Sequence, residues 1–370
     1  MRKVSRIHRI SDASAHEYEK SVDALVSAVD KRMTRRVEES GLIGPNPLSV
    51  MYDNHANHGS LLVNVLKFRD FTLLEQILPW VINSYTSRGF ALEYFPIVLD
   101  QWKQVIAEHL SAEAAGEILP VYEWMESVIG ELYREISQGQ IRVIPPHEVM
   151  DEARKREVDQ FVQLLITGRH IEALQFLRLR VTDGESMKEY YDRLLVPAMY
   201  EVGHLWETNR ITVAHEHLAT SIIMRIITYF YMDIVNSEHT KGKVVVTSSA
   251  NEYHEVGARI VADFLELDGW DVIFMGANTP SRDLLVLLQE EHPDLLCISV
   301  TMANNFSIVQ KMIQESRALA ELQNMRIMLG GYAFTYSTDS ATKMGADALI
   351  PSAAACIIKA REWWEEMRYA

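Results

Sequence analysis

Cysteine is scarce in this sequence. Only Cys297 and Cys356 occur among the 370 residues, and both lie in the C-terminal third. Two isolated thiols make neither a disulfide framework nor a zinc site, so we expect both to be buried as small apolar residues. Because no cysteine precedes residue 297, no group can be attached to the N-terminal part through a thiol.

Long apolar runs are also missing. No uncharged apolar stretch reaches the roughly eighteen residues that a transmembrane helix needs, so we predict no membrane span. The opening residues, MRKVSRIHRI, are basic but lack the continuous apolar core of a secretory signal. The sequence therefore predicts a cytoplasmic protein.

Positive charge is in deficit. The chain has 36 Lys and Arg against 51 Asp and Glu, which gives a formal net charge of -15. We find no basic stripe and no helix-turn-helix pattern, so direct DNA binding is not expected. We also find no nucleophile–base pair, phosphate-binding glycine loop or second metal cluster, and we predict that the protein is not an enzyme.

Helical periodicity fills the first two thirds of the chain. Residues 15–138 show apolar residues at helical spacing in about five or six segments, with no alternating strand pattern. Gly139, Pro145 and Pro146 interrupt helices at 138–149, where we place a domain boundary. Four further helices joined by short turns predict a small four-helix bundle over 150–237.

The pattern changes after residue 240. The short β-branched segments KVVVTSSA, DVIFMG, DLLCISV, RIMLGG and ADALIP alternate with helical segments. Such alternation predicts a Rossmann-like, doubly wound parallel sheet with a ligand at the carboxyl ends of its strands. We therefore predict a multi-domain α and α/β chain with an all-helical, globin-like domain (1–142), a four-helix bundle (150–237) and a Rossmann-like domain (240–370).

A histidine follows the first predicted strand. The strand ends near Ser249, and Tyr253 and His254 come next, just before a helix. Neutral imidazole is the commonest transition-metal ligand, and Glu252 can accept the other ring N–H and fix the tautomer. Gly257 lets a bulky group approach the start of the helix.

The spacing of three motifs is specific. After His254 and Gly257 come 41 residues, then Ser299-Val300-Thr301, then 28 residues and Gly330-Gly331. This arrangement resembles the signature of cobalamin-binding domains, in which Asp-x-His-x-x-Gly is followed at these spacings by Ser-x-Leu or Ser-x-Thr and by Gly-Gly. The resemblance covers about 125 residues.

The resemblance implies the cofactor and its mode of binding. His254 would replace the dimethylbenzimidazole of cobalamin as the lower ligand of cobalt. The displaced nucleotide tail would enter the sheet beside Ser299 and Thr301, where Gly330 and Gly331 leave room for it. The sequence departs from the signature at Glu252, which stands in place of Asp. Light-responsive members of the superfamily also tend to carry Glu there.

A second motif lies in the predicted bundle. Trp206 is followed, after nine residues, by Glu216 and His217. Taken alone, Trp206 can be a core residue and the Glu–His pair an ordinary helix surface. The passage nevertheless resembles the cap of light-sensing cobalamin-dependent repressors, in which such residues cover the adenosyl group of adenosylcobalamin. Val213 matches the small apolar residue of that cap.

Two features depart from those repressors. Glu207 stands where a histidine often ligates cobalt after photolysis, so a stable bis-histidine product is not expected. A helical region also replaces their DNA-binding domain. The resemblance therefore implies signalling through homo-oligomerisation or through a downstream signalling protein.

The N-terminal helical domain carries a third group of polar residues. Asp53, His55 and His58 are expected in a loop before a helix, and Arg88 follows among several aromatic residues. These are suitable partners for the pyrrole N–H groups and propionates of a linear tetrapyrrole. Such an architecture resembles that of the photocobilins, which hold cobalamin and biliverdin side by side. A bilin here would be non-covalent; haem on either histidine, or an aromatic core with no ligand, are the alternatives.

The sequence thus supports a leading hypothesis and two alternatives. The leading one is a cobalamin-dependent photoreceptor in which light removes the adenosyl group and the bundle repacks. A corrinoid carrier protein of a methyltransferase system would instead leave the upper face of the cofactor open. The third is a cobalamin-binding adaptor with no light response.

Overall fold

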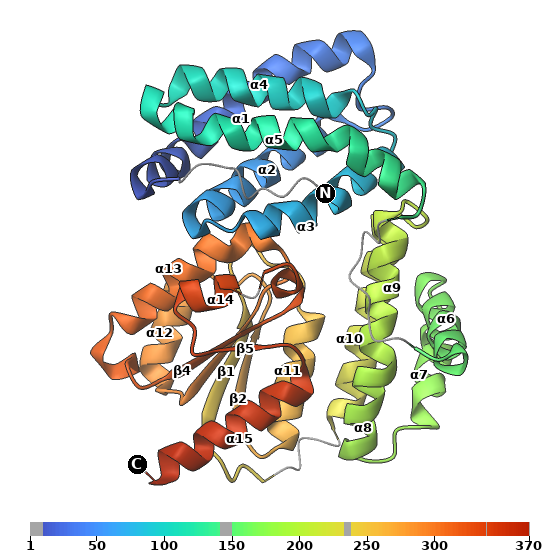
Figure 1. Cartoon of the computed structure of the whole chain (residues 1–370). Coiled ribbons are helices and arrows are strands. Elements are labelled where there is room, and N and C mark those ends of the chain that lie inside the picture. The colour runs from blue at the N-terminus through green and yellow to red at the C-terminus, as the bar shows by residue number, and fades with distance from the viewer. Residues whose placement is uncertain (1–9, 141–149, 233–237, 338, 370) are drawn as a thin grey trace. The chain divides into compact units, whose positions relative to one another are not determined.

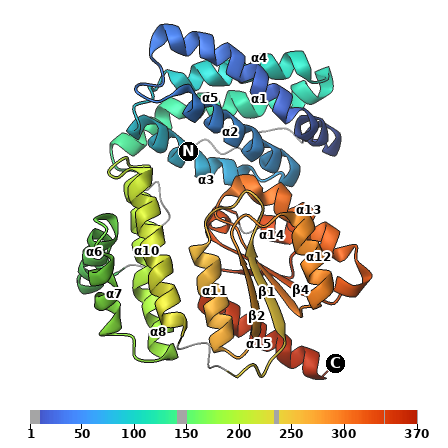
Figure 2. The same cartoon turned by 180° about the vertical axis from the view of Figure 1, so that it is seen from behind.

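The computed structural model of the chain describes residues 10–140, 150–232, 238–337 and 339–369 (Figures 1 and 2). Contacts divide the chain into two compact units. Unit 1 comprises Met1–Pro145 with Glu207–Asn209, and unit 2 comprises Pro146–Trp206 with Arg210–Ala370. Most of the predicted boundary at 138–149 lies outside the described residues, so the division into three domains stays a prediction.

Unit 1 is helical, as predicted. Ser11, Asp70 and Ser111 cap three of its helices by accepting hydrogen bonds from backbone N–H groups of the first turn. Trp102, Tyr18 and Tyr122 are among its largest fully buried side chains. The helices described are α1 (Asp12–Ser40), α2 (Leu48–Phe68), α3 (Phe71–Ser87), α4 (Tyr94–His109) and α5 (Ala112–Ser137).

The prediction of a loop at His55 and His58 was wrong. Both histidines lie inside α2, two turns or more from its start at Leu48. The cluster of Asn, Asp and His suggested a loop because these residues have weak helix propensity. Tertiary contacts override that propensity: Gly59 packs closely on α1, where an added Cβ would lie 2.9 Å from Val22 Cγ2.

Unit 2 begins with the predicted helical bundle. Its third helix is not one regular α-helix: α8 and α9 are joined by a π-helical turn. Apolar residues of the bundle share one buried cluster with Ile260, Phe264, Ala353 and Ile357 of two later helices. The elements are α6 (Glu152–Ile166), α7 (His170–Arg178), α8 (Gly184–Tyr190), η1 (Tyr191–Leu195), α9 (Val196–Glu207) and α10 (Val213–Tyr231).

The rest of unit 2 is a five-stranded parallel sheet of order β2-β1-β3-β4-β5, as the alternation of strands and helices predicted. The strands are β1 (Lys243–Ser248), β2 (Asp271–Gly276), β3 (Leu295–Ser299), β4 (Arg326–Gly330) and β5 (Ala348–Ile350). The connecting elements are α11 (Val256–Leu267), α12 (Ser281–Glu291), η2 (Ala303–Asn305), α13 (Phe306–Arg317), η3 (Ala320–Leu322), η4 (Tyr332–Thr335), α14 (Asp339–Met344) and α15 (Ala353–Tyr369). All strands are parallel, so their carboxyl ends meet at one edge.

Helices cover both faces of the sheet. Helices α12, α13 and α14 lie together on one face, and α11 and α15 on the other (Figures 1 and 2). Sequence reasoning missed α15, which packs against α11 through Cys356, Ala360 and Trp363. Both cysteines are free and buried, as predicted. The hydrogen bond with Cys356, together with burial, raises the pKa of Cys297 well above its ordinary value.

Backbone packing explains one of the three predicted site glycines, Gly331. Gly331 has a φ of 108°, a conformation that is strained for any side chain. An added Cβ there would lie 2.4 Å from the carbonyl oxygen of Val300. Room for a cofactor tail was the expected reason for this glycine, but the approach of two backbone segments already requires it.

In the described part of the chain, none of the helices is both long enough and apolar enough to cross a membrane.

The packing at Gly331 leads to a first prediction. Gly331→Ala should destabilise unit 2 by at least about 1–3 kcal/mol from backbone strain, with the contact at Val300 adding to it. Gly203→Ala in α9 is the matched control, because an added Cβ there meets nothing within 4 Å. It should stabilise by about 0.5–1 kcal/mol. Urea unfolding of the full chain measures both, and equal effects would contradict this explanation.

Candidate functional site

The site is built on the loop that joins β1 to α11. The loop is tied to its neighbour after β2: Asn251 N donates to Asn278 Oδ1 at 2.8 Å, and Asn278 N donates to the Glu252 carbonyl at 2.8 Å. Asn251 and Asn278 have φ values of 62° and 52°, a conformation that asparagine tolerates better than most residues. His254 is therefore presented by a loop with a fixed backbone.

Glu252 connects the loop to the end of β3. Its Oε1 accepts from His254 Nδ1 at 2.5 Å and from His254 N at 3.2 Å. Its Oε2 accepts from the backbone N–H groups of Thr301 and Met302, both at 2.9 Å, and from Asn305 Nδ2 at 3.3 Å. The carboxylate is fully buried, and these donors satisfy both of its oxygens.

The histidine beside it is accessible. The His254 side chain is 56% exposed. Partial burial lowers the pKa of His254. The hydrogen bond and charge of Glu252, together with the charge of Glu216, outweigh this effect, so the pKa is raised overall. For Glu252, burial raises the pKa, but the hydrogen bonds from His254, Met302 and Thr301 outweigh burial and lower the pKa overall. When the ring is neutral, donation from Nδ1 leaves the Nε2 lone pair free to bind a metal.

The surroundings of His254 fit a large cofactor. Ser249 Oγ is buried and has no hydrogen-bond partner among the described residues. An added Cβ on Gly257 would meet only Ser299 Oγ, at 3.9 Å, so space is open at the start of α11. Tyr253 is 72% exposed, which is unusual for an aromatic side chain beside a site. An unsatisfied polar atom, an open helix start and an exposed ring all suit a bound cobalamin.

The other predicted residues of the sheet lie at the same edge. Ser299 ends β3 and Gly330 ends β4, and these two residues pair in register. An added Cβ on Gly330 would approach the carbonyl oxygen of Ile350 at 3.0 Å. Thr301 is half-buried and contributes its N–H to Glu252. A nucleotide tail beside these residues stays a prediction.

The predicted cap residues lie on α9 and at the start of α10. Trp206 is partly buried against the bundle core. Val213 is 52% exposed, and the His217 side chain is 74% exposed, with Nδ1 at 2.5 Å from Glu216 Oε2. The charge of Glu216 helps to raise the pKa of His254, so the start of α10 lies near the loop that carries this histidine. This placement suits a lid as well as an ordinary helix surface, and the cap stays a prediction.

Two groups at the site escaped sequence reasoning. Met302 acts through its backbone N–H, which no side-chain pattern reveals. Asn305 lies far from Glu252 in sequence, and only the fold brings it to the carboxylate. The available signal was a polar residue four positions after Thr301.

The structure does not assemble the predicted tetrapyrrole site of unit 1. Asp53 is exposed, whereas His55 is 2% exposed on another face of α2. Both ring nitrogens of His55 have protein partners: Asp30 Oδ1 at 2.6 Å and the Tyr94 hydroxyl at 2.9 Å. His58 Nε2 lies 3.3 Å from the Tyr122 hydroxyl. A bilin or haem on these histidines would have to displace such contacts.

The other predicted residues of unit 1 are also engaged. Arg88 Nη1 donates to the Ser84 hydroxyl at 2.6 Å and to the Ser84 carbonyl at 2.9 Å. Burial raises the pKa of Glu207, against a hydrogen bond from Trp80 and the charge of Arg88. Glu207 is thus grouped with unit 1, whereas its neighbour Trp206 belongs to unit 2.

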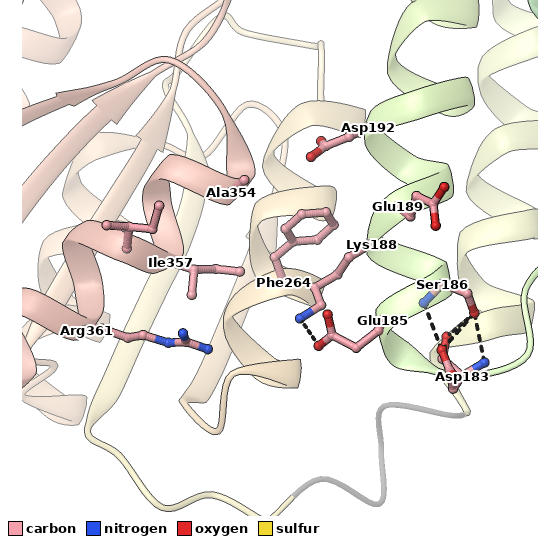
Figure 3. Close-up of a pocket in the computed structure, with 11 residues that line it drawn as sticks. Asp183, Glu185, Ser186, Lys188, Glu189, Asp192, Phe264, Ala354, Ile357 and Arg361 are labelled. Atoms are coloured by element: carbon pink, nitrogen blue, oxygen red, sulfur yellow. Dashed lines mark hydrogen bonds and ion pairs between the residues drawn. The ribbon is translucent and has the colours of Figure 1, made fainter. Parts of the chain in front are cut away.

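An open groove lies further along α11, where Phe264 approaches α8, η1 and α15 (Figure 3). Its volume is about 870 Å³. Its charges have partners: Lys188 pairs with Glu185, Arg361 with Asp268, and Asp183 caps α8 through Ser186 N at 2.8 Å. The lining residues are Asp183, Glu185, Ser186, Lys188, Glu189, Asp192, Phe264, Ala354, Ile357, Ile358 and Arg361, and they include no residue of the predicted cobalamin site.

Comparison with known proteins agrees with this geometry. Residues 242–355 match a family described as B12 binding domain, and residues 157–231 match a second family of that description. The fold is similar to that of the monomethylamine corrinoid protein of Methanosarcina barkeri, with a TM-score of 0.50 and 14% identity. That similarity covers 56% of this chain and 99% of the other. The two matched segments identify a cobalamin-binding protein.

Two of the relatives carry names of different functional classes. The chain is 24% identical over 193 residues to dimethylamine corrinoid protein 3 of Methanosarcina acetivorans, which covers 52% of this chain and 88% of that protein. It is 26% identical over 165 residues to the HTH-type transcriptional repressor CarA of Myxococcus xanthus, over 45% of this chain and 54% of that protein. The sequence predicted no direct DNA binding. One relative is named as a transcriptional repressor, so the comparison does not support that prediction.

The half-buried His58 of unit 1 generates a second prediction. Burial, with a smaller effect of His55, lowers the pKa of His58 from 6.5 to about 3. The unfolded chain therefore binds the proton more readily, and unit 1 should lose stability as the pH falls from 6.5 towards 3. The loss is at most about 1.4 kcal/mol per pH unit.

The measurement is urea unfolding of the full chain between neutral pH and about pH 5, above the range where ordinary carboxyl groups titrate. His58→Phe should remove part of the pH dependence of the free energy of unfolding. His16→Gln, whose side chain is 62% exposed, is the control and should leave it intact. The same slope in wild type and His58→Phe would show that burial does not depress this pKa.

Proposed function

We propose that this chain is a cobalamin-dependent photoreceptor or signalling protein that binds adenosylcobalamin with His254 as the lower ligand of cobalt. One observation carries the proposal: His254, oriented by buried Glu252, offers Nε2 at the sheet edge, near the start of α10. We assign no catalysed reaction to it.

Each part of the site has a proposed task. Glu252 fixes the tautomer of His254, while Ser249 offers an unsatisfied hydroxyl to the cofactor. Gly257, Ser299, Thr301, Gly330 and Gly331 would border the nucleotide tail. Tyr253 would be covered by the corrin, because an exposed aromatic ring gains from contact with a large apolar surface.

Above the cofactor, the proposed lid comprises Trp206, Val213, Glu216 and His217. Adenosylcobalamin supplies a cobalt–carbon bond that light breaks, and loss of the adenosyl group would remove the packing partner of these side chains. The bundle and α11 share a buried cluster, so a shift of α10 must repack Ile260 and Phe264. Such a repacking is a two-state change that can alter subunit or partner contacts.

The output would be a change of homo-oligomeric state or of binding to a downstream signalling protein in the cytoplasm. Biliverdin in unit 1 is a subordinate hypothesis, because the histidines proposed for it are occupied by protein partners. An absorption spectrum of the purified protein shows whether a bilin is bound. A bilin gives a far-red band, whereas cobalamin alone gives only corrinoid bands.

The photoreceptor proposal predicts a light-dependent assembly. The chain is loaded in the dark with adenosylcobalamin, and its molar mass is measured by light scattering before and after illumination. We expect a change of mass or hydrodynamic radius in the adenosyl form and none with cyanocobalamin, whose upper ligand is not an alkyl group. His254→Ala should show weakened cofactor binding. An unchanged profile after complete photolysis would contradict a photoreceptor.

A corrinoid carrier of a methyltransferase system is the alternative, favoured by the relatives named as corrinoid proteins. The two functions predict different effects of Trp206→Ala. A lid predicts weaker binding of adenosylcobalamin by about tenfold, with methylcobalamin affected less, because the indole packs on the larger ligand. An open upper face predicts no difference between the two cofactors.

The measurement is the dissociation constant of each cofactor in the dark. Trp124→Ala in α5 removes an indole of similar exposure from unit 1, and it should leave both constants unchanged. Equal constants for wild type and Trp206→Ala would favour the carrier.

A further inference from the structure

The carboxylate of Glu252 is held by an unusual set of donors. Beyond the two bonds with His254, it accepts two backbone N–H groups from the loop after β3 and one side-chain amide. All three of these donors converge on Oε2, which leaves Oε1 to the histidine. Donors that converge on one anion stabilise its charged form and fix its orientation.

Asn305 supplies the side-chain donor. It ends η2 directly before α13, and its backbone N donates to the Met302 carbonyl at 3.0 Å, which closes the turn. The side chain is 2% exposed, and Nδ2 lies 3.3 Å from Glu252 Oε2 and 3.4 Å from the Asn251 carbonyl. A single amide therefore contacts both the backbone of the histidine loop and the carboxylate that orients the histidine.

The length of Glu252 matches this arrangement. An aspartate at this position would be shorter by one methylene, and its carboxylate could not reach the N–H groups of Thr301 and Met302 while bonding His254 from an unchanged backbone. The departure from the Asp of the signature thus has a structural counterpart in the loop after β3.

We propose that Asn305 is a positioning residue for the cobalt ligand. With the N–H groups of Thr301 and Met302 it holds Glu252, and Glu252 holds His254 with Nε2 directed at the cofactor. The inference rests on the proposed function only in so far as that function includes ligation by His254. It requires no response to light.

Three variants test the role. Asn305→Leu keeps a similar branched shape but removes the donor, and Asn305→Asp places a second carboxylate beside Glu252. Asn305→Gln retains an amide on a longer side chain and is the conservative variant. Gln314→Leu, an exposed polar-to-apolar change on α13, is the matched control.

The full chain is loaded in the dark with hydroxocobalamin, and affinity is measured from the absorption spectrum. Reduction to the paramagnetic cobalt(II) form then allows electron paramagnetic resonance to detect nitrogen coupling from the axial ligand. Asn305→Leu should weaken binding about tenfold and broaden or remove the coupling, and Asn305→Asp should do more. Asn305→Gln should recover part of the affinity, and Gln314→Leu should match wild type.

Melting of the apoprotein separates positioning from folding. A structural role alone would lower the melting temperature and leave the nitrogen coupling of the loaded fraction unchanged, and that result would overturn the inference. Wild-type affinity and coupling in both Asn305→Leu and Asn305→Asp would also overturn it, while ligation by His254 would stand. Failure of the wild-type chain to bind the corrinoid would instead overturn the proposed function, and this inference with it.

Discussion

The hydrogen bond between His254 Nδ1 and the buried carboxylate of Glu252 is the interaction on which the rest of the site depends. It sets which ring nitrogen carries the lone pair, and it does so from a loop whose backbone is fixed by Asn251 and Asn278. A buried carboxylate is costly unless its oxygens are satisfied, and the loop after β3 supplies the donors that Glu252 needs. The parallel sheet brings these loops together because its strands end at one edge.

The helical bundle packs against the helix that starts at this edge of the sheet. Its buried cluster extends into α11 and α15, so the helix that begins at the histidine loop also carries part of the bundle's core. One polar contact crosses the same boundary: Tyr191 in the π-helical turn donates to Asp263 at 3.4 Å. Within α11, Arg259 Nε lies 2.8 Å from the same carboxylate. Burial raises the pKa of Asp263 to about 7 despite Arg259. A ligand between His254 and α10 would therefore act on the contact between the bundle and α11. This contact is well packed, and the charge of Asp263 in it is only partly compensated by Arg259.

Much of this architecture could be predicted from the sequence, because its signals are local or regularly spaced. The five strands, the histidine loop and the helical N-terminal part follow from periodicity, and the motif spacing pointed to cobalamin. What failed depends on tertiary contacts. His55 and His58 lie in a helix whose contacts include hydrogen bonds from their rings to Asp30, Tyr94 and Tyr122. No local sequence pattern encodes such partners. The π-helical turn and the Met302 and Asn305 donors to Glu252 were missed for the same reason. Helix α15 was missed although its apolar residues recur at helical spacing. Gly331 was noticed but explained by the cofactor rather than by Val300.

The central claim is that a protein imidazole, rather than the benzimidazole of the cofactor, ligates cobalt from below. The most direct test is electron paramagnetic resonance of the chain loaded with cobalt(II) cobalamin, prepared once with ordinary histidine and once with ¹⁵N-labelled histidine. The account predicts that the nitrogen splitting changes from a triplet to a doublet on labelling, because the ligating nitrogen then has a different nuclear spin. A triplet that persists in the labelled protein would show that the cofactor keeps its own base, and would contradict the account.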